Sequence, residues 1–262
     1  MSRRLVRLYA RARHTMKMAM FADVHGNLEA ISTCLAHARA LGADRFAFLG
    51  DLVGYGADPV AVLHLIEGYA ESGAVVVLGN HDAAALGLAV NLNPSAQVAI
   101  AWTQAQLDAG RRAFLEALPL AVTEDKVLFV HASAEAPDQW IYITSPAQAD
   151  ASLRGAAGTS YVFCGHVHEQ QLYFRGADGR PALFRPVPDR PIPAPSQRQW
   201  LAIVGSTGQP RDRNNAACYA LFDSDRERLT FYRVPYDYRS AAMKVRAAGL
   251  PERIALRLER GV

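Results

Sequence analysis

Five short segments of the sequence carry side chains that can bind metal ions. Imidazole nitrogens mixed with amide and carboxylate oxygens suit Mn, Fe, Zn, Co or Ni better than Ca or Mg, which prefer all-oxygen sites. Two such ions held close together can activate water and neutralise charge on a phosphoryl group. The residue types therefore indicate hydrolysis of a phosphate ester. The segments are DVHGN from Asp23, GDLVGYG from Gly50, GNHD from Gly79, HAS from His131 and GHVH from Gly165.

Each segment alone also has a purely structural explanation. An isolated Asp-x-His occurs often by chance, and both Gly-Asp and GNHD read as turns. GHVH is the strongest single segment, because two imidazoles beside a glycine turn have few structural explanations. In extended backbone, residues i and i+2 point to the same side, so we expect Asp23 and His25 to grip one ion together. Five such segments in one chain exceed a chance interpretation.

Each segment directly follows a short apolar run, which is typical of a buried strand. Residues 28–41 between the first two runs repeat apolar positions every three to four residues, with Asn27 as N-cap and Gly42 as stop, which predicts a helix. In open α/β sheets the loops at the carboxyl ends of the strands converge. We therefore expect the five segments to meet. The apolar runs are residues 17–22, 45–49, 75–78, 127–130 and 161–164.

The second half of the chain has a different pattern. Four short β-like stretches are separated by Gly, Pro and Asp turns, which is typical of antiparallel sheet. Residues 181–195 contain too many prolines for a central strand or helix, so we expect a surface loop there. From Tyr238 the pattern is helical, with Gly249 and Pro251 dividing two short helices. The β-like stretches are residues 172–174, 200–204, 218–222 and 229–234.

Composition sets the outer limits. The chain has 262 residues, of which 50% are hydrophobic and 20% charged, and these ordinary globular proportions fit one large domain or two small ones. A single core is simpler, so we expect one domain over residues 16–262. No apolar run reaches the roughly 18 to 20 residues that a membrane helix needs, and the N-terminus lacks the pattern of a secretory signal. The three cysteines form neither a disulfide framework nor a CxxC metal knuckle. We expect a cytoplasmic protein that binds no membrane.

The basic charge is concentrated at the N-terminus. Residues 1–15 hold five arginines and no acid, which exceeds the formal net charge of +3, so the rest of the chain is slightly acidic. We interpret residues 1–15 as a solvated basic N-terminal extension, with contact to an anionic partner as the alternative. A general nucleic-acid-binding surface is not indicated.

Taken together, the series DxH, GDxxxYG, GNHD, H and GHxH resembles the calcineurin-like metallophosphoesterase superfamily. DVHGN and GDLVGYGADP are similar to its smaller bacterial phosphodiesterase branch, as are GSTGQPRD from Gly205 and the tail from Ala247. The resemblance covers nearly all of residues 16–262. It implies an α/β fold, a four-layer α/β/β/α sandwich of two mixed sheets flanked by helices, with a helical tail over residues 239–262.

The resemblance also implies a site for two divalent transition-metal ions, Mn, Fe, Zn, Co or Ni, joined by the carboxylate of Asp51. A hydroxide held between the two ions would be the nucleophile. The other ligands divide into Asp23, His25 and His168 for one ion and Asn80, His131 and His166 for the other.

His81 is the candidate for helping the leaving group to depart. It would protonate the departing alkoxide or hold a phosphate oxygen, while Asp82 would orient it and stabilise its cationic form. The alternative is a structural histidine at the rim of the site. Some relatives that resemble scaffolds lack this histidine or several ligands. None is missing here, so we expect an enzyme and keep a catalytically idle scaffold as the rival.

The substrate class depends on which side chains hold phosphate. In the Ser/Thr protein phosphatase branch, the corresponding segments read close to GDYVDRG and RGNHE, and each supplies an arginine. Tyr55 and Leu78 stand at those positions here. A protein phosphatase of that type is therefore disfavoured.

Arg211, in GQPRD, is the best remaining cation for a substrate phosphate, because its planar fork suits bidentate recognition. A surface turn residue is the alternative. Asn80 and His81 are further candidates for substrate contact. We expect a phosphodiesterase that acts on small nucleotides or dinucleoside polyphosphates, with a phosphomonoesterase or Ser/Thr protein phosphatase as the alternative.

Overall fold

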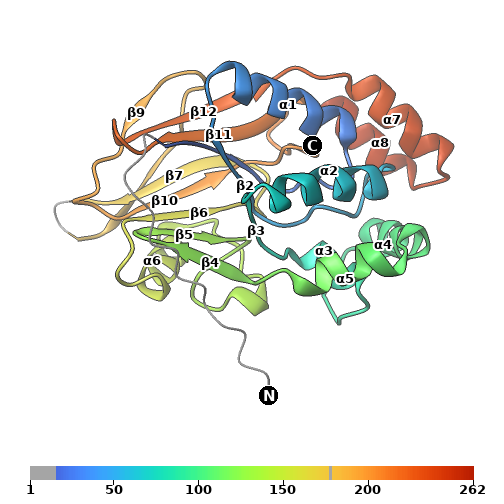
Figure 1. Ribbon diagram of the computed structural model, residues 1–262, viewed down its shortest axis with the longest axis horizontal. Helices are drawn as coiled ribbons and strands as arrows, with labels where there is room; N and C mark the ends of the chain where they lie inside the picture. The colour runs from blue at the N-terminus through green and yellow to red at the C-terminus, as the bar shows by residue number, and fades with distance from the viewer. Residues whose placement is uncertain (1–15, 177–178) are drawn as a thin grey trace.

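The computed structural model describes residues 16–176 and 179–262, and the extension expected at residues 1–15 lies outside them. The described residues form two six-stranded mixed sheets (Figure 1). The first sheet has the order β3 (Val75–Val76), β2 (Arg45–Phe48), β1 (Lys17–Phe21), β11 (Ala217–Asp223), β12 (Arg228–Val234) and β9 (Ile192–Pro193). The second has the order β4 (Ala121–Glu124), β5 (Val127–Val130), β6 (Tyr161–Cys164), β10 (Trp200–Val204), β7 (Gln170–Arg175) and β8 (Pro181–Phe184).

Strand β1 shows why the predicted runs are apolar throughout. Met18 and Met20 pack into the cluster between the two sheets, whereas Ala19 and Phe21 pack outward under helices. Because successive side chains of a strand point to opposite faces, a strand covered on both sides needs apolar residues at every position. The continuous apolar runs therefore reflect burial on both faces of the sheets.

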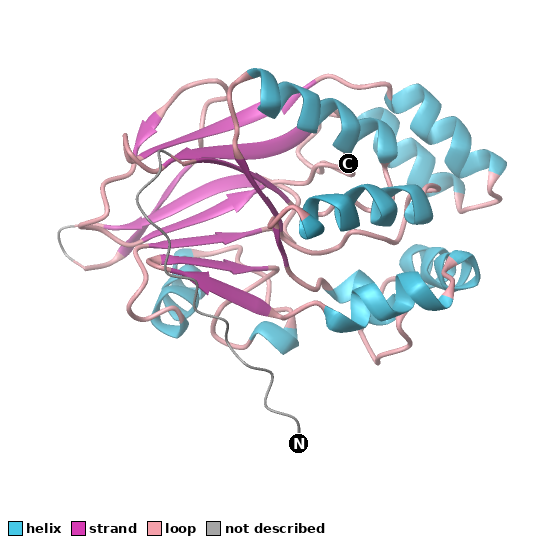
Figure 2. Cartoon of the chain, viewed as in Figure 1, coloured by secondary structure: helices cyan, strands magenta, loops and turns pink. Residues whose placement is uncertain are grey.

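Helices cover the outer faces of the pair of sheets (Figure 2). Helix α1 (Leu28–Ala40) follows its predicted N-cap, since the Asn27 carboxamide oxygen accepts a hydrogen bond from the Ala30 N–H at 3.1 Å. Against the second sheet, Leu153 of α6 (Pro146–Gly155) packs on Val162 and Leu201. The predicted four-layer α/β/β/α sandwich is confirmed. The remaining helices are α2 (Pro59–Glu71), α3 (Asn80–Ala85), α4 (Pro94–Gln106), α5 (Ala109–Ala117), η1 (Pro137–Gln139), α6 (Pro146–Gly155), α7 (Tyr238–Ala247) and α8 (Glu252–Arg260).

The expectation of a surface loop over residues 181–195 is wrong in part. Short strands β8 and β9 lie in this stretch, and each is the edge strand of its sheet. Proline has no N–H to donate, but an edge strand pairs on one side only, so prolines are tolerated there. Their position at the edges explains why a proline-rich sequence still forms strands.

The helical tail has the predicted division, with α7 and α8 separated by Gly249 and Pro251. Its apolar side chains, among them Val245 and Ile254, pack in one cluster with Tyr55. The tail therefore lies against the loop that carries the second motif. No helix in the described ranges combines the length and the apolar character needed to cross a membrane.

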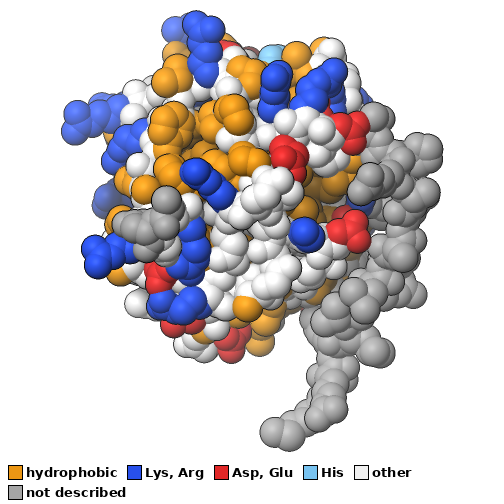
Figure 3. Space-filling view, turned by 90° about the vertical axis from the view of Figure 1, so that its left-hand side faces the viewer, with side chains coloured by type: hydrophobic (Ala, Val, Ile, Leu, Met, Phe, Trp, Pro, Cys, Tyr) orange, Lys and Arg blue, Asp and Glu red, His pale blue; other side chains and the backbone are white. Residues whose placement is uncertain are grey.

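One end face of the molecule has an apolar patch with Lys and Arg side chains around it (Figure 3). Separately, the edge strand β8 and the residues after it expose three large apolar side chains, Leu183, Phe184 and Val187. Singly exposed apolar residues are common on protein surfaces. Neither feature lies among the predicted site residues.

Candidate metal centre

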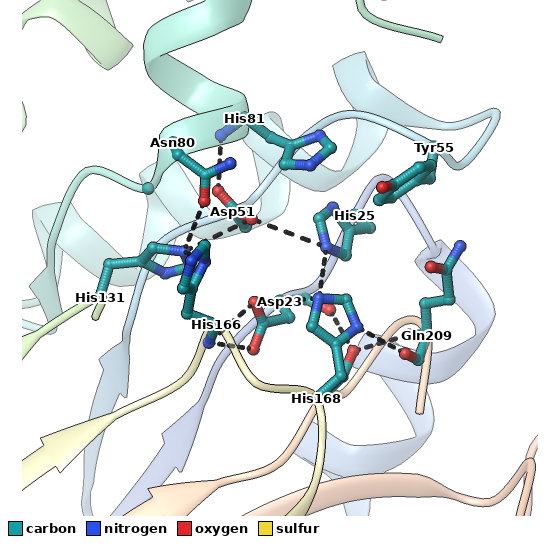
Figure 4. A network of polar contacts seen from close by, with 12 residues as sticks. Asp23, His25, Asp51, Tyr55, Asn80, His81, His131, His166, His168 and Gln209 are labelled. Atoms are coloured by element: carbon teal, nitrogen blue, oxygen red, sulfur yellow. Dashed lines mark hydrogen bonds and ion pairs between the residues drawn. The ribbon is translucent and has the colours of Figure 1, made fainter. Parts of the chain in front are cut away.

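The loops that follow β1, β2, β3, β5 and β6 converge, as predicted, and Figure 4 shows the seven expected ligands facing one another. Main-chain hydrogen bonds join these loops. The His25 N–H donates to the Asp51 carbonyl at 2.8 Å, and the Gly165 N–H donates to the His131 carbonyl at 2.9 Å. Segments far apart in sequence are thereby locked into one site.

One group of ligand-type atoms comes from the first and last motifs. The Nε2 atom of His168 lies 3.4 Å from Oδ1 of Asp23 and 3.2 Å from Nε2 of His25. All three residues are buried, and their ligand atoms lie within 4.8 Å of one another. This spacing is compatible with three ligands around a single ion.

A second group surrounds His131. Its Nε2 atom lies 3.1 Å from Oδ1 of Asn80, 3.2 Å from Nδ1 of His166 and 3.4 Å from Oδ2 of Asp51. The same Asp51 oxygen lies 3.7 Å from Nε2 of His25, which belongs to the first group. Asp51 therefore stands between the two groups.

Hydrogen bonds to backbone carbonyls set the tautomers of two of the histidines. Nδ1 of His25 lies 3.2 Å from the Val53 carbonyl oxygen, and Nδ1 of His168 lies 2.6 Å from that of Gln209. A carbonyl oxygen can only accept, so each Nδ1 must carry the proton and each neutral ring presents a lone pair at Nε2. Histidines that ligate metals are held in this way.

These two lone pairs face each other at 3.2 Å. Protonation of a ring would relieve the repulsion, but burial holds the pKa of both His25 and His168 well below the usual range, and the positive charge of Arg211 adds to this effect at both rings. A cation between the two nitrogens would turn the repulsion into coordination. The residues present therefore fit a metal ion.

The protein alone also leaves much of the negative charge of the site's carboxylates without a balancing positive charge. Burial, together with the nearby Asp51, raises the pKa of Asp23 to about 7. Burial alone would lower the pKa of His131, but the carboxylates of Asp51 and Asp23 outweigh it and raise this pKa to about 9. Divalent cations would remove both shifts by neutralising the buried negative charge.

The backbone of the site differs from the extended form expected for Asp23 and His25. Both residues are left-handed, with φ of 52° and 50°. The chain turns sharply after β1, and the Gly26 N–H then donates to the Leu52 carbonyl at 2.9 Å. Non-glycine residues rarely adopt positive φ, and such residues concentrate at functional sites. Six of them are Asp23, His25, Asp51, Tyr55, His166 and His168, with φ between 50° and 68°.

Asp82 was expected to orient His81, but its side-chain hydrogen bonds go to backbone groups instead. Its Oδ1 accepts the N–H groups of Leu52 and Val53 at 2.8 and 3.1 Å, and its Oδ2 accepts that of Gly79 at 2.9 Å. The buried carboxylate thus binds three backbone donors, whereas Nδ1 of the His81 imidazole has no hydrogen-bond partner. Asp82 instead ties the loop after β2 to the start of α3.

His81 lies where it was expected, at the edge of the site. Its N–H donates to Oδ1 of Asp51 at 2.7 Å, and its ring contacts those of His25 and Tyr55, with centroids 4.7 and 4.6 Å away. Burial, with Arg211 and His131 adding to it against the opposing charge of Asp51, lowers the pKa of His81 to about 4. Its Nδ1 is buried without a partner. A pKa in this range corresponds to a neutral imidazole near pH 7.

Arg211 also lies at the site. It lines a cavity of about 520 Å³ together with Asp51, Asn80 and His81. One of its terminal nitrogens, Nη2, donates to Oε1 of Gln209 at 3.1 Å. Arg211 therefore lies at the candidate site and is not an isolated residue of a surface turn, which was the alternative interpretation.

Several cavity residues were not predicted. Tyr142 stacks on His166 with ring centroids 3.9 Å apart and is still 49% exposed, and Trp140 meets His131 edge to face at 5.8 Å. Asn91 and Asn93 line the same cavity. None of these residues belongs to a metal motif. The only sequence signal was the pair of aromatic residues, Trp140 and Tyr142, in one loop.

The fold and the ligand arrangement are those of a metal-dependent phosphoesterase, and comparison with known proteins gives the family. A family model described as the calcineurin-like phosphoesterase superfamily domain matches residues 16–227. The chain belongs to this superfamily, whose members are metal-dependent hydrolases of phosphate esters.

Three relatives illustrate the similarity. Uncharacterized protein MJ0912 of Methanocaldococcus jannaschii is 32% identical over 247 residues, which cover 92% of this chain and 96% of its own. A metallophosphoesterase from Sphaerobacter thermophilus superposes with a TM-score of 0.84 at 34% identity, covering 95% of this chain and 100% of its own. Hypothetical protein PH1004 from Pyrococcus horikoshii OT3 has a TM-score of 0.78 at 20% identity, covering 94% and 99%, and shows likeness of fold alone.

Proposed function

We propose that the protein is a phosphodiesterase that hydrolyses small nucleotides or dinucleoside polyphosphates at a centre of two divalent transition-metal ions. The observation that carries the metal centre is the pair of imidazole lone pairs facing each other at 3.2 Å between His25 and His168. Two nitrogen lone pairs that repel one another when no ion lies between them can both coordinate one shared cation. Mn, Fe, Zn, Co and Ni all suit such mixed donors.

The ligands divide between two ions joined by Asp51. When bound, the two ions would lower the pKa of a water molecule and neutralise charge on the phosphoryl oxygens. The remaining ligands would be Asp23, His25 and His168 on one side and Asn80, His131 and His166 on the other.

The protein's own polar groups act on the substrate. Arg211 holds a phosphate oxygen, because its guanidinium lines the cavity beside the ligands. An anionic phosphate next to His81 raises the pKa of that imidazole, so that the ring takes up a proton from water and donates it to the departing oxygen. Asn80 presents its amide to the same cavity. Asp82 positions the loops and does not touch the substrate.

The mouth of the cavity supports a nucleotide as the substrate. The half-exposed ring of Tyr142 offers a surface on which a base can stack, and Trp140 lies on the same loop. The amides of Asn91 and Asn93 can donate and accept hydrogen bonds at base edges. A base is therefore the group that this part of the cavity fits best.

A phosphomonoesterase or Ser/Thr protein phosphatase is the alternative activity, and the residues at the two arginine positions disfavour the latter. Tyr55 is 2% exposed and accepts a hydrogen bond from Asn93, while Leu78 is 6% exposed in the apolar core. Neither can hold a phosphate oxygen as an arginine does. The intact ligand set disfavours an idle scaffold.

The test is activity after removal and return of metal. Protein stripped of metal and reloaded with Mn, Fe, Co, Ni or Zn is assayed on bis-p-nitrophenyl phosphate, p-nitrophenyl phosphate, diadenosine tetraphosphate and a phosphoserine peptide. We expect turnover of bis-p-nitrophenyl phosphate and of diadenosine tetraphosphate to exceed that of p-nitrophenyl phosphate and the peptide. Preferred turnover of the peptide would reverse the substrate assignment, and no hydrolysis with any ion would leave the scaffold as the better proposal.

A further inference from the structure

Two arginines contact the same buried ring beside the metal centre. The guanidinium carbon of Arg211 lies 5.8 Å from the ring centroid of Tyr55, and that of Arg257 lies 5.9 Å from it. Arg211 follows β10, whereas Arg257 belongs to α8 of the helical tail. The packing of the tail against Tyr55 therefore adds a second cation to the site that the sequence motifs do not include.

Neither guanidinium has a carboxylate partner within salt-bridge distance among the described residues. Arg246 in the neighbouring helix shows the usual arrangement, since it pairs with both Glu252 and Glu259 at 2.7 Å. Two cations near each other without an acid are unfavourable, and burial together with the charge of Arg211 lowers the pKa of Arg257. The pair lacks an anion.

Buried donors around these arginines lack acceptors as well. They are Nε of Arg211, Nη1 of Arg257 and Nε2 of Gln209. Buried polar groups are nearly always paired, and each unpaired donor costs free energy. Figure 4 shows Gln209 on the same side of the centre as Tyr55 and His168. The unpaired donors therefore lie around one region beside the metal centre.

Two residues of this region, Arg211 and Tyr55, also belong to the cavity of the metal centre. Arg211 and Tyr55 line that cavity together with His168. The ring of Tyr55 also meets that of His25 with centroids 4.8 Å apart. An anion at the arginines would thus lie next to a phosphoryl group at the metal ligands.

We propose that Arg211, Arg257 and the Gln209 amide form a second anion subsite, which holds a phosphate group adjacent to the one that is hydrolysed. The proposal rests on the proposed function and narrows its substrates to compounds with consecutive phosphates, such as nucleoside or dinucleoside polyphosphates. Two planar guanidinium groups and an amide can together bind the several oxygens of a phosphate group that is not itself hydrolysed. The opposing possibility is that Arg257 only packs on Tyr55 and stabilises its loop by a cation–π contact.

The test compares inhibitors with one phosphate and with several. Hydrolysis of bis-p-nitrophenyl phosphate by the metal-loaded protein is inhibited with orthophosphate or inorganic triphosphate, with free metal held constant. Because charge-assisted hydrogen bonds are lost, Arg257→Gln should weaken inhibition by triphosphate about 10- to 100-fold relative to orthophosphate. Arg257→Lys keeps the charge but loses the planar guanidinium, so its inhibition constant for triphosphate should lie between those of Arg257→Gln and the wild type.

Arg253→Gln is the matched control, since Arg253 is an exposed arginine one turn earlier on the same helix. It should leave both inhibition constants unchanged. Equal weakening of the two inhibitors by Arg257→Gln, or no change in either, would overturn the subsite and leave the packing role.

Failure of the proposed function is a separate result. If the wild type hydrolyses no ester with any metal, calorimetric titration with triphosphate and orthophosphate still tests the subsite. Preference for triphosphate that Arg257→Gln removes would uphold the subsite in the absence of turnover. Equal affinity for the two anions in the wild type would refute it.

Discussion

Replacing Asp82 by alanine tests its assignment as a structural residue. The substitution leaves the N–H groups of Leu52, Val53 and Gly79 without their acceptor in a fully buried position. At about 1 to 1.5 kcal/mol for each lost hydrogen bond, the free energy of unfolding should fall by about 3 to 4.5 kcal/mol. The loss is large compared with the usual stability of a domain.

Urea denaturation of the metal-free protein measures this change. With a slope near 3 kcal/mol per molar urea, the midpoint should fall by about 1 to 1.5 M. Asp82→Asn is the graded variant, because its amide oxygen can still accept two of the three N–H groups, and it should lose less. An unchanged midpoint combined with lost turnover would refute the reasoning and restore Asp82 as the residue that orients His81.

Three further predictions concern the metal centre and the cavity. In the metal-free protein the pKa of His131 is about 9 and that of Asp23 about 7, so both bind protons at pH 7 that coordination must displace. Metal affinity should therefore rise from pH 6 to 8, and calorimetry should give heats of binding that depend on the buffer. Heats that do not depend on the buffer would contradict the assignment. A Cβ at residue 79 would overlap the backbone nitrogen and Oδ1 of Asp51, so Gly79→Ala should weaken metal binding at least tenfold. A metal titration would measure this loss, and an unchanged affinity would count against the placement of Asp51 in the metal centre. Loss of base stacking in Tyr142→Ala should raise KM for a dinucleoside polyphosphate about 5- to 100-fold and change KM for bis-p-nitrophenyl phosphate less; equal changes would argue against a base at this ring.

The residues that meet at the candidate metal centre were predictable because their signal is local. A metal ligand must stand in a loop that a rigid strand aims, and each motif from Asp23 to His168 directly follows an apolar run. The order of the motifs therefore carried both the sandwich fold and the residues that meet in it. The N-cap at Asn27 was local in the same way.

Other features depend on contacts that no local pattern contains. The left-handed backbone of Asp23 and His25 is imposed by hydrogen bonds to the loop after β2. Asp82 lies beside His81 in sequence, but in the folded chain its carboxylate accepts hydrogen bonds from backbone N–H groups of Leu52 and Gly79. Arg257 reaches Tyr55 only because the tail folds back onto the second motif. Tertiary packing decided each of these.

Metal content and activity measured on the same samples test the central claim most directly. Wild-type protein reloaded with Mn and freed of excess ion should contain two ions per chain by elemental analysis and hydrolyse bis-p-nitrophenyl phosphate. Asp51→Asn, which removes the carboxylate between the two ligand groups, should lose at least one ion and nearly all turnover. Full activity in wild-type protein with no bound metal, or in Asp51→Asn, would contradict a two-metal centre.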